Sequence, residues 1–350
     1  MKIKVFDFFS GCGGTSAGLR RAGMNIVLGI DHDEDTAKTY KKNFPEAEFM
    51  LTDLTKLRTN KLKSYFDDCK PNPVLFCGCA PCQPFSKQNG WRSKGDPRAS
   101  LLNHFGRFVR YYKPDFVLVE NVPGIQNVSP SASPLADFIK LIKKLGYHTV
   151  VGTVDSRDYG VPQKRKRLVL LASLHGVLRL PEKTHGPGTK REYSTVGDWI
   201  KNFPPIRAGG ESKTVPNHRA ARLSKKNLKR ISATPPGGSR SCWPKHLILK
   251  CHKSEHAGHT DVYGRLRKDQ PASALTTRCI SLSNGRFGHP TQNRAISIRE
   301  AASLQTFDPN FIFVGSLISM AKQIGNAVPV LLAKALGKVY NEQAQALRFE

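Results

Sequence analysis

The sequence predicts an α/β protein: a doubly wound, mostly parallel sheet with a smaller, irregular, β-containing domain inserted. Segments typical of strands alternate with segments typical of helices through the first half of the 350-residue chain, the order that builds parallel sheets. The strand segments are almost continuously apolar, as expected for strands that helices cover on both faces. A change of composition after about residue 181 marks the inserted domain.

Seven short apolar runs bounded by turn residues are expected to form the strands. They are residues 3–9, 25–31, 48–54, 72–78, 115–122, 148–154 and 167–174. Between them, amphipathic patterns predict helices at residues 17–23, 33–44, 99–112 and 133–146. Acidic residues occupy the first turn of the second helix, and Lys113-Pro114 ends the third, because the residue before a proline avoids helical geometry.

Residues from about 181 to 288 are rich in Gly, Pro, Ser, Lys and Arg, with only short, uncertain strands. Amphipathic helices then resume at 297–307 and 329–347. We therefore expect three parts: a first domain at 1–182, an insert at 183–287, and a C-terminal segment at 288–350 that returns to the first domain.

The formal charge of +28 points to a polyanionic partner, nucleic acid first and an anionic membrane surface second. No apolar run approaches the roughly 18 residues of a membrane span, and the first residues do not resemble a secretory signal. The eight cysteines are most simply reduced thiols of a cytosolic protein.

A glycine-containing turn, "FFSGCGG" at 8–14, follows the first strand, the layout of a nucleotide site in an open sheet. A dinucleotide fingerprint needs a third glycine, but Ser16 stands in its place. S-adenosylmethionine has no pyrophosphate and needs only a close backbone approach near a helix N-terminus. Asp31 and Asp53, at the next two strand ends, are placed to accept from ribose hydroxyls and from an adenine amino group, although such acids also serve as plain helix caps.

Three cysteines lie within "CGCAPC" at residues 77–82. A zinc site would need a fourth ligand, and no paired motif is near. Cys77 lies in the apolar strand and Cys79 at its end, whereas Cys82 follows Ala-Pro in a loop. Glu120 ends the next strand, so its carboxyl group should face the same crevice.

Further on, "VPQKRKR" places Gln163, Arg165 and Arg167 immediately before a strand. A thiol, a carboxylic acid and guanidinium groups at one sheet edge are typical of covalent catalysis with a thiolate nucleophile.

These motifs together resemble the C5-cytosine DNA methyltransferase family, bacterial restriction–modification type. "DFFSGCGGTSAGL" resembles its cofactor loop, "GID" and "TDL" its ribose and adenine positions, "PCQPFS" its nucleophile motif, "ENV" its acid motif and "QKRKR" its arginine motif. "YGRLRKDQPASALTT" resembles the motif that orders the recognition domain, and "QIGNAVP" the returning cofactor motif. The match covers about 1–182 and 262–340 in the family's order.

The resemblance implies a mechanism. The Cys82 thiolate would add to C6 of a cytosine swung out of the duplex, Glu120 would bond N3, and C5 would take the methyl group of S-adenosylmethionine. Arg167 would hold the ring oxygen and Arg165 would support the loop and backbone. The run 86–100 would be a mobile loop that closes on DNA. Cofactor-binding residues implied by the family motifs are Phe9, Gly11, Gly13, Gly14, Asp31, His32, Asp53, Leu54 and Asn326; Ser86 would contact DNA.

The insert would be the target-recognition domain. Basic residues at helical spacing in "HRAARLSKKNLKR" predict a phosphate-facing stripe, with a solvated helix face as the alternative. Its members are Arg219, Arg222, Lys226, Lys229 and Arg230. In the loop 236–246, Ser239, Arg240 and Trp243 are expected to reach base edges. Cys251, His252, His256 and His259 fit no standard zinc finger, and we expect no metal.

The implied partner is double-stranded DNA, and the family also implies a cognate restriction endonuclease that acts separately. We expect a cytoplasmic, nucleoid-associated monomer with no membrane. Three alternatives remain at this stage: the tRNA-methylating branch of the family, a catalytically inactive DNA-binding relative, and a dehydrogenase. The tRNA branch has a shorter recognition region and a CFT tripeptide, which this chain lacks. The broken glycine fingerprint disfavours the dehydrogenase.

Overall fold

The computed structural model describes residues 2–80, 101–123, 134–249 and 261–346. The chain divides into two compact units. The first comprises Met1–Tyr159, Lys166–Lys183 and Val328–Glu350, and the second comprises Gly160–Arg165 and Thr184–Ala327. No helix in the described ranges is long and apolar enough to cross a membrane.

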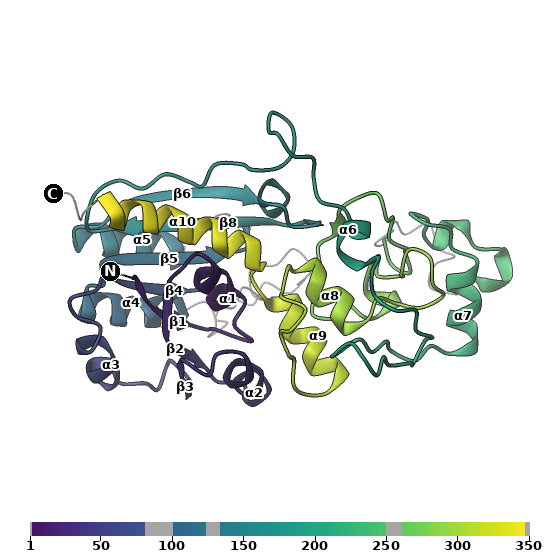
Figure 1. Ribbon diagram of the computed structural model, residues 1–350, viewed down its shortest axis with the longest axis horizontal. Coiled ribbons are helices and arrows are strands. Elements are labelled where there is room, and N and C mark those ends of the chain that lie inside the picture. Colours follow the sequence, from purple (N-terminus) through teal and green to yellow (C-terminus); the bar gives the residue numbers. More distant parts are fainter. Residues whose placement is uncertain (1, 81–100, 124–133, 250–260, 347–350) are drawn as a thin grey trace. The chain divides into compact units, whose positions relative to one another are not determined.

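The first unit is built on a seven-stranded sheet of order β3-β2-β1-β4-β5-β8-β6 (Figure 1). All its neighbours pair in parallel except β8, which is antiparallel to both β5 and β6. The predicted mostly parallel α/β sheet is therefore confirmed. The strands are β1 (Lys4–Phe8), β2 (Asn25–Asp31), β3 (Glu48–Leu51), β4 (Val74–Gly78), β5 (Phe116–Asn121), β6 (His148–Asp155) and β8 (Lys166–Ser173).

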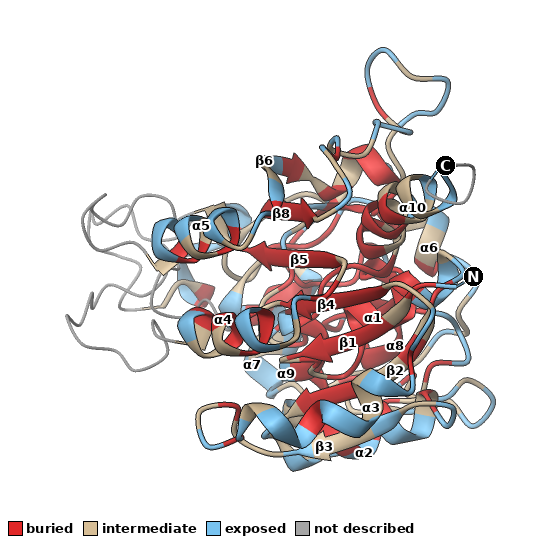
Figure 2. Cartoon of the chain, turned by 90° about the vertical axis from the view of Figure 1, so that its left-hand side faces the viewer, coloured by how far each residue is buried: buried red, intermediate tan, exposed pale blue. Residues whose placement is uncertain are grey.

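Helices cover both faces of this sheet (Figure 1). Figure 2 shows buried strands between α4 and α5 on one side and α1 and α10 on the other; α4 and α5 expose their outer surfaces, whereas most of α1 is buried. Because successive side chains of a strand point to opposite faces, Phe6 and Phe8 join the cluster under α4 and α5, whereas Asp7 bonds α1 through Ser16. The helices are α1 (Gly14–Arg21), α2 (Glu34–Asn43), α3 (Lys63–Asp67), α4 (Leu101–Tyr112), α5 (Pro134–Lys144) and α10 (Val330–Ala346).

The register of the central strands aligns the loops that follow them. Phe8, the last residue of β1, pairs with Ile30 on one side and with Gly78 on the other. The chain leaves the sheet just after these positions in all three strands. The carboxyl ends of parallel strands thus form one edge, the place where ligands bind in open α/β sheets.

The second unit has few regular elements. Its helices are α6 (Val196–Ile200), α7 (Lys225–Ser232), α8 (Ile298–Leu304) and α9 (Leu317–Asn326), and the two-residue strands β7 (Gln163–Lys164) and β9 (Ala272–Ser273) pair in parallel. Its small apolar cluster is centred on Ile231, Leu282 and Ala295.

The chain returns to the first unit at Val328, forty residues later than the expected boundary at 288. Residues 288–327 instead bond within the second unit. The backbone N–H of Ile298 donates to Arg219 O at 3.1 Å, and that of Arg299 donates to Asn217 O at 3.0 Å. The helical pattern at 297–307 predicted α8 correctly, but periodicity carries no information about which unit a helix joins.

Candidate active site

The loop after β1 has a backbone that few residue types adopt. Phe9 has a φ of 58°, and Gly11 and Gly13 have φ values of 52° and 93°. Positive φ is costly for a bulky residue such as Phe and is tolerated mainly where the surroundings enforce it. A Cβ atom on Gly13 would lie 2.3 Å from the Phe44 ring. This part of the predicted cofactor loop is therefore a tightly constrained turn.

Asp31, at the end of β2, fastens this loop. Its Oδ2 accepts a hydrogen bond of 2.9 Å from the Gly11 N–H, while Oδ1 accepts from the N–H groups of His32 at 2.7 Å and Asp33 at 3.0 Å. A carboxylate offers about four acceptor positions, so one remains after these three bonds. The His32 side chain is 72% exposed.

The loop suits a ligand that carries a carboxylate. Helix α1 begins after Gly13, which has no side chain to cap the first N–H groups. Such uncapped groups bind anions. The Cβ side of Gly11 is open, with no atom within 4 Å, so a ligand can approach the backbone there. These features fit the amino-acid end of S-adenosylmethionine, and Asp31 fits its ribose.

Asp53 follows β3 and accepts a 2.8 Å bond from the Thr55 N–H. This bond holds the pKa of Asp53 below its usual value. Arg107 of α4 donates to Leu54 O at 3.0 Å, and His104 lies one turn earlier on the same helix. Burial lowers the pKa of His104, with the Arg107 charge adding to the effect. The sequence analysis did not include His104 and Arg107 among the site residues. Their i, i+3 spacing, which places both on one face of the predicted helix, was the available signal.

A buried carboxyl group lies beneath the cofactor loop. Asp7 Oδ2 accepts a 2.6 Å hydrogen bond from Ser16, whose hydroxyl is also 2.9 Å from Tyr40. Asp7 is completely buried, and burial raises its pKa to about 7. This network joins β1, α1 and α2, and so it supports the loop from below.

The side chains of Glu120 and Arg167 form a nearly buried ion pair. Arg167 Nε lies 2.8 Å from Glu120 Oε1, and the two side chains are 14% and 8% exposed. Within the described residues, Glu120 Oε1 receives no directed hydrogen bond, so the contact is one of charge. Glu120 lies next to the end of β5 and Arg167 next to the start of β8, and the antiparallel pairing of these strands, with Glu120 opposite Val169, brings the two side chains to the same end of the sheet. The fold therefore joins the acid motif to the second arginine of the arginine motif.

Neighbouring residues link this pair to the end of β4. Asn121 Nδ2 donates to Ala80 O at 3.4 Å, and Thr15 Oγ1 is 3.5 Å from Cys79 Sγ. Ala80 directly precedes the segment that holds Cys82. Cys82, Ser86 and the predicted mobile loop 86–100 lie outside the described residues.

The other cysteines at this edge are poor nucleophiles. Burial raises the pKa of Cys77 and of Cys79 well above the ordinary thiol value, and that of Cys12 to about 12. Attack requires a thiolate, so none of these thiols suits the role. Among the cysteines considered at this edge, Cys82 remains as the candidate.

Arg165 and Asn326 belong to the second unit. The buried Arg165 donates from Nη1 to Leu275 O at 2.8 Å and from Nη2 to Gly325 O at 3.0 Å. Gln163 Nε2 donates to Gln305 Oε1 at 2.9 Å. Arg165 therefore braces backbone, as expected of its loop-supporting role, and exposed Asn326 ends α9.

The helical spacing predicts that the basic residues of 219–230 lie along one helix. The structure differs, because only part of this segment is helical. Helix α7 begins after Ser224, whose side chain accepts from the Asn227 N–H. Arg219 and Arg222 precede this cap in irregular chain, so a single helical stripe is wrong. A serine can cap a helix or occupy its interior, and local spacing does not decide between them.

Arg230 is buried rather than phosphate-facing. Its Nε donates to Leu247 O at 3.0 Å, and its guanidinium carbon lies 5.2 Å from the Trp243 ring centroid. Trp243 is itself buried and donates to Thr234 Oγ1 at 2.8 Å, so its predicted contact with base edges is also wrong. The exposed residues of the basic set are Arg219, Arg222, Lys226 and Lys229.

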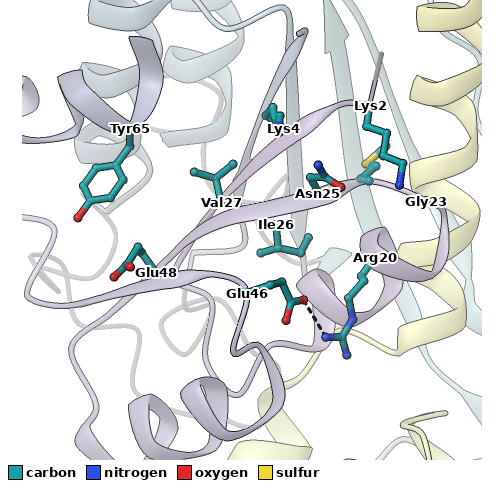
Figure 3. Close-up of a pocket in the computed structure, with 11 residues that line it drawn as sticks. Lys2, Lys4, Arg20, Gly23, Asn25, Ile26, Val27, Glu46, Glu48 and Tyr65 are labelled. Atoms are coloured by element: carbon teal, nitrogen blue, oxygen red, sulfur yellow. Dashed lines mark hydrogen bonds and ion pairs between the residues drawn. The ribbon is translucent and has the colours of Figure 1, made fainter. Parts of the chain in front are cut away.

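A pocket of about 560 Å³ lies at the opposite edge of the sheet. Figure 3 shows its walls, which include the first residues of three strands, Lys4, Asn25 and Glu48, and the 2.9 Å ion pair of Arg20 with Glu46. Because these are the amino ends of the strands, this pocket is separate from the cofactor loop.

Comparisons with known proteins agree with this geometry. The sequence profile of the family described as C-5 cytosine-specific DNA methylase matches residues 3–342. The chain belongs to this family. It is therefore a DNA methyltransferase specific for C5 of cytosine.

Two similar relatives cover nearly the whole chain. A Type II methylase, M.HgiDII of Herpetosiphon aurantiacus, is 38% identical over 95% of this chain and 94% of its own. The Type II methyltransferase M1.HphI of Haemophilus parahaemolyticus is 34% identical over 97% of this chain and 86% of its own.

Solved structures share the fold. A putative DNA modification methyltransferase encoded within an E. coli prophage has a TM-score of 0.77 at 22% identity, covering 98% of this chain and 100% of that one. The methyltransferase EhMeth of Entamoeba histolytica has a TM-score of 0.68 at 17% identity, covering 98% and 99%.

Proposed function

We propose that the chain transfers a methyl group from S-adenosylmethionine to C5 of a flipped-out cytosine in one duplex DNA sequence, through a covalent Cys82 adduct. The observation that carries this proposal is the buried Glu120–Arg167 pair. It stands beside the segment that leads to Cys82, through the contact of Asn121 with Ala80. The constrained cofactor loop follows β1 at the same strand edge.

The first unit provides the cofactor site. The N–H groups at the start of α1 hold the carboxylate, with Gly11, Gly13 and Gly14 allowing close approach. Asp31 accepts from the ribose, and Phe9, His32, Asp53 and Leu54 surround the adenosine end. When bound, S-adenosylmethionine supplies an electrophilic methyl group on sulfur.

Cys82 begins the reaction, because its sulfur forms a bond to C6 and pushes electron density onto C5. Glu120, once protonated or sharing a proton with the base, bonds N3 and so stabilises the enamine-like intermediate, and Arg167 holds the ring oxygen. Its closeness to Glu120 keeps both groups oriented. After methylation, loss of the C5 proton lets the Cys82–C6 bond break by elimination, which restores the thiolate.

Target recognition is the role of the insert at 183–287, and the catalytic role belongs to 1–182 together with the segment that returns to the first unit at Val328. The residues that contact DNA are Ser86, Arg219, Arg222, Lys226, Lys229 and Arg240. We infer a monomer that acts in the cytoplasm at the nucleoid. By analogy with the Type II relatives, it protects sites of a restriction–modification system, whose endonuclease acts separately.

Replacing Cys82 with Ala tests the mechanism. Methylation should fall below detection, while specific DNA binding persists, because the thiol acts only in the covalent step. Duplex DNA with 5-fluorocytosine at the target should trap the wild type and the matched control Cys79→Ala as stable adducts, but not Cys82→Ala. An adduct with Cys82→Ala would place the nucleophile elsewhere. Methyl transfer by the wild type to tRNA instead of duplex DNA would contradict the proposed substrate.

Asp31→Asn tests the cofactor site. The variant retains acceptor capacity through its amide oxygen but loses the negative charge. Affinity for S-adenosylmethionine should fall by about 1.5–3 kcal/mol, the range for hydrogen bonds to charged groups. Isothermal titration calorimetry measures the change, and unchanged affinity would remove Asp31 from the site.

A further inference from the structure

The segment 235–242 of the second unit is held more firmly than an ordinary surface loop. The residues that flank it, Thr234 and Trp243, are joined by the 2.8 Å bond from Trp243 Nε1 to Thr234 Oγ1. Trp243 packs edge-on against Tyr263, with ring centroids 5.1 Å apart. The base of the loop is therefore closed by buried side chains from both of its ends.

The middle of the loop is bound by backbone. The Gly237 N–H donates to Arg265 O, and the Arg265 N–H donates to Gly238 O, both at 3.1 Å. A turn bond of 2.8 Å from the Gly238 N–H to Pro235 O tightens the same residues. Gly237 needs its φ of 76° to make this turn.

Arg286 completes the attachment from 48 residues further along the chain. Its Nη1 donates to Gly238 O at 2.7 Å and also to Gly237 O. On its other side, Nη2 lies 2.9 Å from Asp261 Oδ1, which orients the guanidinium. A Cβ atom on Gly264 would lie 2.8 Å from Arg286 Cγ, so Gly264 leaves room for this side chain.

We propose that Arg286 is a positioning residue for sequence specificity, which clamps the loop 235–242 so that Ser239, Arg240 and Ser241 meet base edges in a fixed geometry. This inference rests on the proposed role of the insert in target recognition. The tip carries hydroxyl and guanidinium groups, which recognise base edges. Ordering the loop in advance removes an entropy cost that binding would otherwise incur.

The clamp accounts for features that a passive loop does not need. Loops are normally the mobile part of a domain, yet this one is attached by an indole, by backbone and by an arginine. Ser241 is exposed, and Ser239 and Arg240 are partly so, whereas Trp243 and Thr234 are buried. The structure thus separates an anchoring part of the loop from a presenting part.

Arg286→Lys is the informative variant, because an ammonium keeps the charge but lacks the planar fork that spans Asp261 and two carbonyl groups. Arg191→Lys, at an exposed arginine of the same unit, is the matched control. Methylation rates are measured on the cognate duplex and on every duplex with one substituted base pair. Hydrogen exchange of the loop amides is followed in parallel.

For Arg286→Lys we expect faster exchange confined to 237–242, an unchanged affinity for S-adenosylmethionine, and discrimination reduced on the order of tenfold at all base pairs that the loop contacts. Arg240→Ala should lose discrimination at one base pair only. Arg191→Lys should match the wild type. Faster loop exchange with unchanged discrimination would overturn the inference, whereas a wild type that methylates no duplex sequence would overturn the proposed function instead.

Discussion

The two units fill their interiors by different means. In the first, phenylalanine rings from the strands and from α4 meet in one cluster, with the Phe8 centroid 5.0–5.3 Å from those of Phe76, Phe105 and Phe108. In the second, arginines bind main-chain carbonyl groups. Arg299, which is fully buried, donates to Pro216 O at 2.9 Å and to Phe311 O at 2.7 Å. A unit with few strands leaves many carbonyl groups unpaired, and long guanidinium side chains satisfy them.

This difference changes what the net charge of +28 means. Five arginines of the second unit are at least 96% buried: Arg165, Arg230, Arg265, Arg294 and Arg299. Their charges stabilise the fold and do not form a DNA-facing surface. Arg265 alone donates to four carbonyl oxygens and to Asn293 Oδ1. Composition therefore identified the class of partner correctly but overstated the charge that DNA can meet.

The units also treat buried carboxyl groups differently. Burial raises the pKa of Asp7 to about 7, and among the described residues no cation offsets this effect. Burial also acts on Glu300, but Arg294 binds it through two bonds of 2.7 Å, and these hold its pKa below the usual value. Of these two carboxyl groups, only that of Asp7 should therefore titrate near neutral pH.

Two substitutions should destabilise the two interiors by different mechanisms, one by leaving a cavity and the other by leaving carbonyl groups unpaired. Phe76→Ala should lower the free energy of unfolding by about 3–5 kcal/mol, because it leaves a cavity among rings. Arg299→Met keeps most of the volume but leaves carbonyl groups unpaired, at a cost of about 3 kcal/mol or more. Urea denaturation measures both. A near-neutral Arg299→Met would show that packing, not hydrogen bonding, holds the second unit.

Asp7→Asn should flatten the pH dependence of the first unit. The folded-state pKa of about 7 lies above the ordinary 3.8, so between those pH values the folded state keeps a proton that the unfolded state releases. The free energy of unfolding therefore falls as pH rises, by up to about 1.4 kcal/mol per pH unit, and levels off above pH 7. Asp7→Asn should be more stable than the wild type at pH 8. Parallel pH profiles of the two proteins would contradict this assignment.

The smallest expected effect is a change in the salt dependence of DNA binding, which should differ between exposed and buried basic residues. Lys226→Ala should weaken binding to all DNA sequences alike and reduce the slope of log K against log salt by about one unit. Arg230→Met should leave that slope unchanged and lower the thermal midpoint instead, because its guanidinium binds Leu247 O inside the unit. Equal slope changes in both variants would mean that Arg230 reaches DNA after all. Fluorescence anisotropy across a salt series gives both slopes.

Particular residues show how much of the fold and of the site the sequence predicts. Apolar runs predicted all seven strands of the main sheet, and the glycines at 11–14 predicted its constrained turn, because periodicity and backbone freedom are local properties. Glu120 and Arg167 were grouped by their motifs, and register brings them within 2.8 Å. The helix expected across 218–230 shrank to Lys225–Ser232, since capping by Ser224 is one of several options that a local pattern permits.

The sequence by itself determined the family, the order of the elements and the types of group at the strand edge, because hydrophobic period, glycine turns and ordered motifs are written within short windows. Tertiary structure alone decided which basic residues are buried, where the chain returns to the first unit, and which carbonyl groups Arg265, Arg286 and Arg299 bind. The carbonyl groups that these three arginines bind lie up to 83 residues away along the chain. A guanidinium looks the same in the sequence whether its final acceptor is a phosphate or a peptide carbonyl.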